Sequence, residues 1–125
     1  MDKINETVAQ AYIFQCKVNS MANSLEVLID YFLRIRGVEP KGSFRNRIDL
    51  LKKLDLLNLD KLIGYLYWMD DLWTIVKHGN IIGGTSEVAF LKDEKIHSFS
   101  NQEQVDIEAK FSNQIMLEAL RVLRI

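Results

Sequence analysis

The sequence contains few cysteines, prolines and histidines, and two of these shortages exclude kinds of site. Cys16 is the only cysteine in 125 residues, so an internal disulfide and a cysteine-based zinc site are excluded. His78 and His97 are the only histidines, which leaves too few soft ligands for most metal sites. We therefore expect neither a metal nor another cofactor.

Long apolar runs and an excess of one charge are also missing. No run of about 18 apolar residues occurs, so the sequence predicts no membrane span. Residues 1–11 lack the apolar core of an export signal, which with the lone cysteine favours the cytoplasm. Sixteen Lys and Arg stand against seventeen Asp and Glu, so overall charge gives no reason to expect nucleic-acid binding.

The residues that are present suit one helical domain. Apolar residues make up 48% of the chain, and the length fits a single domain, which we place at 1–125. Apolar residues recur at steps of three and four in four segments, which is typical of helices with one buried face. These segments begin near Asn5, Ser43, Asn58 and Ser100, and the first ends at Arg36 before Gly37.

The individual segments carry more specific expectations. The stripe of the first runs from Ala11 to Ile35. The expected face of the last helix consists of Val105, Ala109, Ser112, Met116, Ala119 and Leu123, with Ile107, Phe111 and Ile115 beside it. Gly64 lies inside the third helix at a cost of roughly 1 kcal/mol relative to alanine, for which close approach of a neighbouring helix is one reason.

Residues 80–99 break the helical pattern. Gly83 and Gly84 predict a flexible turn, and the stretches 88–91 and 95–99 fit a small β-hairpin around Lys92-Asp93-Glu94. Short connections elsewhere favour antiparallel neighbours. The expected fold is therefore all-α, an up-down four-helix bundle with a short irregular or β-hairpin excursion near residues 80–99.

The third helical segment is the most informative for function. It is rich in aromatic residues and ends in Lys77-His78-Gly79-Asn80, where the helix dipole favours a protonated histidine. The simplest interpretation is that His78 caps carbonyl groups and that the aromatic side chains are core. The adjacent carboxylates Asp70 and Asp71 point about 100° apart and fit a solvated surface.

The order of these segments resembles the HEPN superfamily. SLEVLIDYFLRIRG in the first helix is followed by FRNRIDLLKKLDLL, then by a helix ending in VKHGN, a glycine-containing excursion and a final helix. HEPN proteins are small helical bundles found with nucleotidyltransferases and in bacterial defence and toxin–antitoxin systems. The resemblance implies metal-independent RNA cleavage, in which His78 would move the proton around attack by a ribose 2′-hydroxyl and an arginine would stabilise the phosphorane.

The sequence departs from that family at the arginine. The family's arginine would fall at positions 71–73, where no residue is basic, and the tyrosine of some members would fall at Asn80. A guanidinium matches two phosphate oxygens at once, so its loss removes transition-state stabilisation worth on the order of 100–1,000-fold. Lys77, Arg45 or Arg47 could substitute, although a solvated helix face is the simpler interpretation of the two arginines.

These considerations set the candidate residues and three hypotheses. The candidate catalytic residues are His78 and Lys77, and the candidate binding residues are Arg45, Arg47, Trp73 and Asn80. The first hypothesis is a HEPN-like homodimer that has lost catalysis and binds RNA or a partner protein. The second is an active, atypical ribonuclease that uses His78, and the third is an unrelated helical adaptor. Whether the chain is an enzyme stays open at this point.

Overall fold

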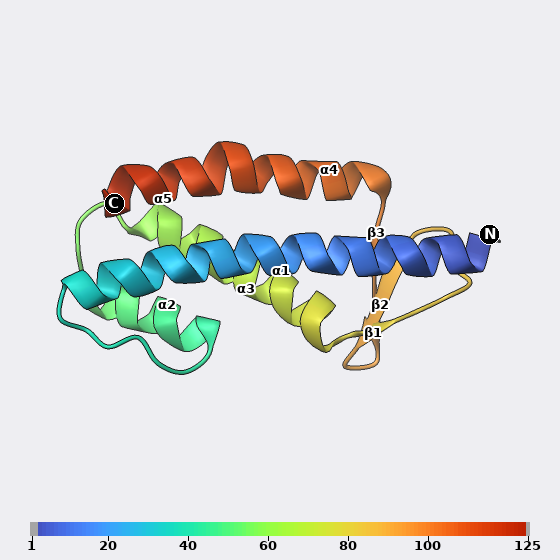
Figure 1. Cartoon of the computed structure of the whole chain (residues 1–125), viewed down its shortest axis with the longest axis horizontal. Coiled ribbons are helices and arrows are strands. Elements are labelled where there is room, and N and C mark those ends of the chain that lie inside the picture. Colours follow the sequence, from blue (N-terminus) through green and yellow to red (C-terminus); the bar gives the residue numbers. More distant parts are fainter. Residues whose placement is uncertain (1–2, 125) are drawn as a thin grey trace.

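The computed structural model describes residues 3–124 and shows a helical bundle with a small sheet at one end (Figure 1). About 69% of the chain is helical, and the expected four-helix bundle with an excursion near residues 80–99 is confirmed. The fourth helix is continuous but contains a π-helical turn, η1. The elements are α1 (Lys3–Ile35), α2 (Phe44–Lys53), α3 (Asp60–His78), β1 (Asn80–Ile81), β2 (Val88–Lys92), β3 (Lys95–Phe99), α4 (Asn101–Lys110), η1 (Phe111–Ile115) and α5 (Met116–Leu123).

None of the helices within residues 3–124 combines the length and the apolar character that a membrane crossing requires.

Direction alternates between α1, α3 and the last helix, but α2 departs from this alternation. The Trp73 indole donates a hydrogen bond to Asn19 across antiparallel α1 and α3. α2 runs parallel to α1 (Figure 1), and its Arg47 meets Glu26 and Asp30 of α1. The up-down expectation therefore does not hold for the step from α1 to α2.

The turn after α1 explains the direction of α2. Gly37, at φ 77°, donates to the carbonyl of Arg34, and Val38 donates to that of Leu33. These two bonds form a Schellman motif, which closes the helix and reverses the chain. Residues 38–43 then return along α1, so α2 starts beside the middle of α1 (Figure 1).

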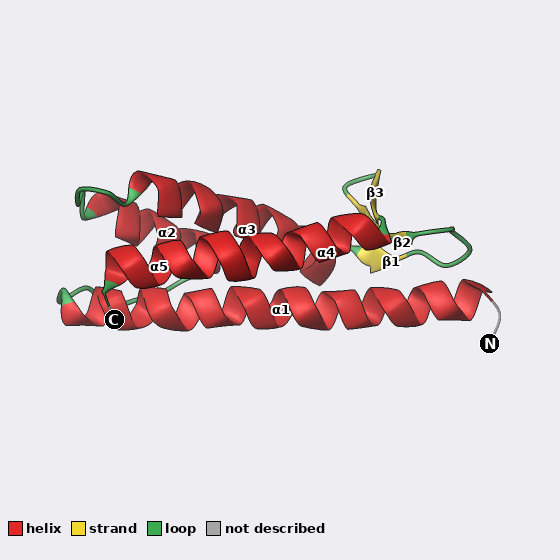
Figure 2. Cartoon of the chain, turned by 90° about the horizontal axis from the view of Figure 1, so that it is seen from above, coloured by secondary structure: helices red, strands yellow, loops and turns green. Residues whose placement is uncertain are grey.

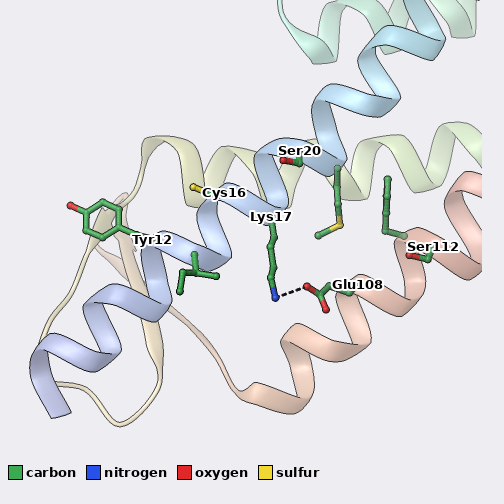
Figure 3. Close-up of a pocket in the computed structure, with 9 residues that line it drawn as sticks. Tyr12, Cys16, Lys17, Ser20, Glu108 and Ser112 are labelled. Carbon is green, nitrogen blue, oxygen red and sulfur yellow. Dashed lines mark ion pairs between the residues drawn. The ribbon is translucent and has the colours of Figure 1, made fainter. Parts of the chain in front are cut away.

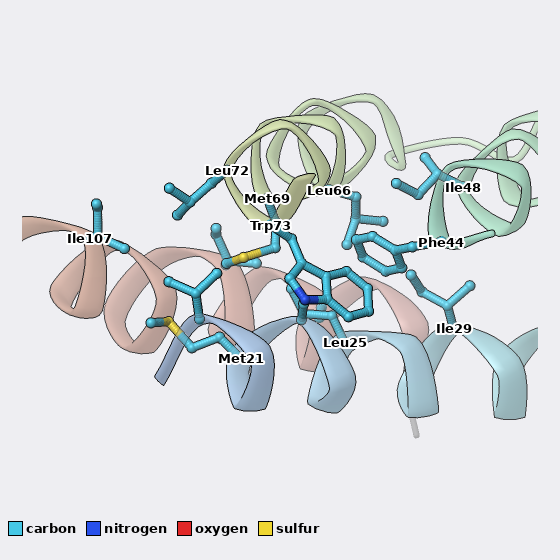
Figure 4. Packing of buried hydrophobic residues seen from close by; sticks show 14 of the residues in the cluster. Met21, Leu25, Ile29, Phe44, Ile48, Leu66, Met69, Leu72, Trp73 and Ile107 are labelled. Carbon is cyan, nitrogen blue, oxygen red and sulfur yellow. The ribbon is translucent and has the colours of Figure 1, made fainter. Parts of the chain in front are cut away.

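Buried residues of α1, α2 and α3 meet in one core (Figure 4). The apolar residues of the third segment that recur at steps of three and four are all buried, as that spacing predicts: Leu59, Leu62, Leu66, Met69, Trp73 and Val76. The buried face of α1 is wider than expected, since it also includes Ala22, Ile29 and Leu33. One expectation on α1 is wrong: Ile35, the last residue of the expected stripe, is 62% exposed.

The expected face of the last helix is confirmed after the π-helical turn, where Ala119 and Leu123 are buried, and is wrong before it. Val105, Ala109 and Ser112 are exposed, whereas Ile107 and Ile115 are buried. In an ideal helix a step of four residues drifts by about 40° around the axis. The wider turn at 111–115 absorbs this drift, so apolar residues spaced by four or eight stay on the core side.

The expected hairpin is confirmed, and a third strand joins it. β2 and β3 pair from Val88 with Phe99 to Lys92 with Lys95. Asp93 and Glu94 between them both have positive φ, as a two-residue type I′ turn requires. The short strand β1 was not expected from the sequence; it pairs antiparallel with β2. The order is β1-β2-β3, and the sheet lies beside the end of α3 and the beginning of α1 (Figures 1 and 2).

Candidate functional site

A cleft of about 720 Å³ lies between α1, α2 and α3. It gathers five of the six candidate residues, namely Arg45, Arg47, Trp73, Lys77 and His78. Asn80 does not line it; this residue is exposed on β1 and pairs with Leu91 of β2. The structure therefore brings the catalytic and most of the binding candidates to one place, although they come from different helices.

The start of α2 fixes one wall of the cleft. The Ser43 hydroxyl accepts a hydrogen bond from the Asn46 backbone at 3.2 Å, which caps the helix. The next residue, Phe44, packs edge-on against Trp73 with 5.5 Å between ring centroids. This aromatic contact holds the start of α2 against α3.

Arg47 links α2 to α1 and is not part of a solvated face. Its guanidinium pairs with Asp30 and, at 3.3 Å, with Glu26, and its side chain is only 20% exposed. Arg47 Nε and Asp30 Oδ1 are buried without a hydrogen-bond partner among residues 3–124. The expectation of a solvated arginine is wrong here, because α2 runs along α1 and brings Arg47 over two carboxylates.

Arg45 makes the corresponding connection from α2 to α3. Its Nη1 lies 3.1 Å from Asp70 and 3.3 Å from Asp71, and the guanidinium lies over the ring of Tyr67. Desolvation opposes the charged form, but the hydrogen bond to Asp71 and the two negative charges outweigh it and raise the pKa of Arg45. The Arg45 side chain is 52% exposed, so its predicted position on a solvated helix face is confirmed. Its two carboxylate partners were not predicted.

Asp70 was expected on the solvated surface, and the structure contradicts this. The residue is only 8% exposed. Desolvation raises the pKa of its carboxyl, and the nearby charge of Arg45 opposes that rise without cancelling it. Asp70 is therefore a buried acid that Arg45 compensates incompletely, while its neighbour Asp71 lies in solvent as expected.

Trp73 forms the floor of the cleft. Its indole N–H donates to Asn19 Oδ1 at 2.7 Å, and the residue is 9% exposed. The ammonium of Lys77 lies 4.5 Å from the ring centroid, a cation–π contact. With one edge packed on Phe44 and Lys77 over the ring, Trp73 is a structural residue and a poor platform for stacking a base.

Of the five candidates that line the cleft, Lys77 and His78 are the two whose side chains have no polar partner within residues 3–124. Both are exposed, and neither side chain makes a hydrogen bond or an ion pair there. The interpretation of His78 as a carbonyl cap is not supported, because the helix end is closed by backbone: Gly79 N–H donates to the carbonyl of Ile75 at 2.9 Å.

Sequence reasoning missed the wall that α1 contributes. Asn19, Asn23 and Glu26 line the cleft, and Asp30 lies beside it through Arg47. The spacing of these four residues could have revealed this wall. They follow one another at steps of four, three and four, and so form a polar stripe beside the apolar stripe of the same helix.

No protein-family model matches the sequence, and neither a curated protein nor a solved structure shows significant similarity to it. Across residues 3–124, the His, Cys, Asp and Glu side chains form no group of three or more that could hold a metal ion.

The charge balance of the cleft limits its chemistry. Its three cationic side chains, two arginines and one lysine, face four carboxylates. Each arginine already meets two of these carboxylates. The groups left for a ligand are one ammonium, one imidazole and the amides of α1, with an aromatic floor beneath them.

Proposed function

We propose that this chain is a HEPN-like helical protein that does not cleave RNA and that binds a protein partner in the cleft between α1, α2 and α3. One observation supports this above all: each arginine of the cleft is held by two carboxylates of a neighbouring helix. An arginine engaged in this way cannot turn its fork toward a phosphate without leaving buried or half-buried carboxylates unpaired.

The same balance of charges disfavours RNA as the ligand. Affinity for nucleic acid comes mainly from lysine and arginine side chains that replace counterions along the phosphates. In this cleft only Lys77 is a cation without a carboxylate among residues 3–124. A protein segment that offers a carboxylate to Lys77 and hydrogen bonds to Asn23 and His78 fits these groups better than a polyanion does.

Cleavage of labelled RNA tests the loss of catalysis. Single-stranded and hairpin RNAs are incubated with stoichiometric wild-type protein and with His78→Ala. We expect the RNA to stay intact in both reactions, because neither arginine of the cleft, Arg45 or Arg47, is free to stabilise the transition state. Cleavage by the wild type that His78→Ala abolishes would contradict the proposal.

A second candidate function is an atypical ribonuclease that uses Lys77 and His78. It is favoured by the position of these two exposed, neighbouring side chains in one cleft. It predicts cleavage without a metal and a large loss in Lys77→Ala as well as in His78→Ala.

The partner is tested by affinity purification with matched baits. Lys77→Glu reverses the one unpaired charge of the cleft, whereas Lys52→Glu reverses an exposed lysine on α2 outside the cleft. We expect a stoichiometric protein that wild type and Lys52→Glu retain and that Lys77→Glu loses. Equal recovery with all three baits would exclude the cleft as the binding site.

A further inference from the structure

The outward face of α1 differs from an ordinary solvated helix surface. α1 lies along one side of the molecule, and no other element of the described chain lies beyond it (Figure 2). The residues that point away from the core form what we call the outer stripe: Ala9, Ile13, Cys16, Ser20, Ser24, Val27 and Tyr31. Steps of four, three, four, four, three and four keep these residues on one face. The stripe holds no charged residue along about 33 Å of helix.

The charges of α1 between its ends are used elsewhere. Lys17 pairs with Glu108 of the last helix at 2.9 Å (Figure 3), and Glu26 and Asp30 pair with Arg47 of α2. Solvent-facing helix positions are usually charged or strongly polar. Exposed apolar side chains that follow such a stripe are typical of a surface that another protein covers.

The stripe is complementary to itself when reversed about Ser20. Cys16 and Ser24 lie four residues on either side of Ser20, and all three side chains are small. Ile13 and Val27 lie seven residues on either side, are branched and apolar, and are 57% and 67% exposed. An antiparallel copy would thus place small residues at the crossing, where helices approach closely, and an apolar pair on each flank.

The charges at the ends of the stripe have the same symmetry. Glu6 and Arg34 lie fourteen residues on either side of Ser20 and carry opposite charges. Reversal of the helix brings Glu6 of one copy toward the partner's Arg34, twice in each pair. A parallel pairing would instead bring like charges together at both ends.

A groove beside the stripe adds to this fit. It has a volume of about 640 Å³, lies between α1 and the last helix, and is lined by Ile13, Met21 and Phe111 among others. Reversal about Ser20 places the partner's Val27 opposite Ile13, at the edge of this groove. An apolar recess therefore lies where the second copy presents an apolar side chain.

We propose that the outer stripe of α1 is a homodimer interface, in which two copies pair antiparallel about a two-fold axis through Ser20. Such an isologous contact closes on itself and gives a dimer and no larger assembly. The residues that form it do not line the cleft of the proposed function, so variants of one surface leave the other intact.

Disulfide trapping tests the position of the axis. In a Cys16→Ser background, Ser20→Cys places two thiols across the axis, close enough for a disulfide, which needs Cα atoms within about 7 Å. The matched control, Ser24→Cys, lies on the same stripe, but its two copies are about 12 Å apart along the helices. We expect rapid formation of a covalent dimer with Ser20→Cys alone. Equal trapping at both positions, or none at Ser20→Cys, would overturn the proposal.

Light scattering and charge-reversal variants test the same interface without a covalent cross-link. Light scattering should give a dimer for the wild type and a monomer for Val27→Glu, with unchanged circular dichroism. Glu6→Arg and Arg34→Glu should each weaken the dimer by about twofold to thirtyfold, and the double variant should restore it. A monomeric wild type, or a double variant weaker than both single ones, would refute the antiparallel pairing.

These results are independent of the proposed function. Trapping through Ser20→Cys would stand whether or not a partner binds the cleft, and loss of a partner in Lys77→Glu would stand for a monomer as well as for a dimer.

Discussion

Replacement of Gly79 by alanine is expected to destabilise the protein, because the end of α3 and the sheet approach each other closely at this residue. A Cβ atom at position 79 would lie 2.3 Å from the carbonyl oxygen of Ile75 and 3.2 Å from Cβ of Phe90. The first atom belongs to the backbone and Phe90 is fully buried, so neither can move freely. Overpacking of this kind costs about 1–3 kcal/mol.

The matched control is Gly64→Ala in the same helix. A Cβ atom at Gly64 would meet nothing within 4 Å, so the idea that a neighbouring helix requires this glycine is wrong. Alanine is favoured over glycine in an exposed helix interior by about 0.5–1 kcal/mol. Gly64→Ala is therefore expected to stabilise the protein.

Thermal unfolding followed by circular dichroism measures both effects. For a chain of this length 1 kcal/mol corresponds to about 4 °C in Tm, so we expect a fall of about 4–12 °C for Gly79→Ala and a rise of about 2–4 °C for Gly64→Ala. If Gly79→Ala leaves Tm unchanged, the packing of β2 against the end of α3 is refuted. If Gly64→Ala lowers Tm, a contact exists there that the structure does not show.

Three further predictions concern the ion pairs and one helix cap. Arg47→Ala should lower the free energy of unfolding by about 1–3 kcal/mol, and by more than Arg45→Ala does, because the Arg47 side chain is 20% exposed and that of Arg45 is 52% exposed. Urea unfolding that ranks the two variants in the opposite order would contradict this argument from burial. Ser100→Ala should lower the free energy of unfolding by about 1 kcal/mol, because the capping box is lost. Ser98 is exposed, so Ser98→Ala should leave the free energy of unfolding nearly unchanged in the same assay. The raised pKa of Asp70 means that its carboxyl favours folding below the ordinary aspartate pKa and loses this contribution as pH rises through the raised value. As pH rises from the ordinary aspartate pKa through the raised value, Asp70→Asn should therefore become more stable relative to the wild type. A difference in unfolding free energy between the two proteins that does not change with pH would contradict the raised pKa.

The parts of the fold that the sequence predicted depend on local patterns. Most of the buried face of the third helix was predicted, because its apolar residues follow one helical period to Val76; the buried Asp70 and Leu72 were missed. The hairpin was predicted because Asp93 and Glu94 suit a tight turn between two apolar stretches.

The parts that the sequence did not predict depend on contacts between distant segments. The direction of α2 is set by how residues 38–43 pack after the Gly37 turn, and a short connection does not reveal this. The face of the last helix depends on the π-helical turn at 111–115, which a fixed period of 3.6 residues cannot anticipate.

The candidate site was predicted by residue type but not by partner. The sequence pointed to Arg45 and Arg47 as residues for a ligand, yet their carboxylates lie on other helices and become visible only when the helices pack. The His78-Gly79 pair, which contributed to the HEPN resemblance, has a reason in the fold, since Gly79 is required by close packing. His-Gly alone is thus weak evidence for catalysis.

The most direct test of the central claim compares the affinity for RNA of the wild type, in which both arginines of the cleft are paired, with that of a variant in which Arg45 has lost its carboxylates. Fluorescence anisotropy of a labelled single-stranded RNA is measured at low and at physiological salt for wild type and for the double variant Asp70→Asn/Asp71→Asn, which leaves Arg45 without a carboxylate. We predict wild-type binding weaker than about 10⁻⁴ M at physiological salt, and tighter, salt-sensitive binding by the double variant. Wild-type binding in the micromolar range with steep salt dependence, unchanged in the double variant, would contradict the account.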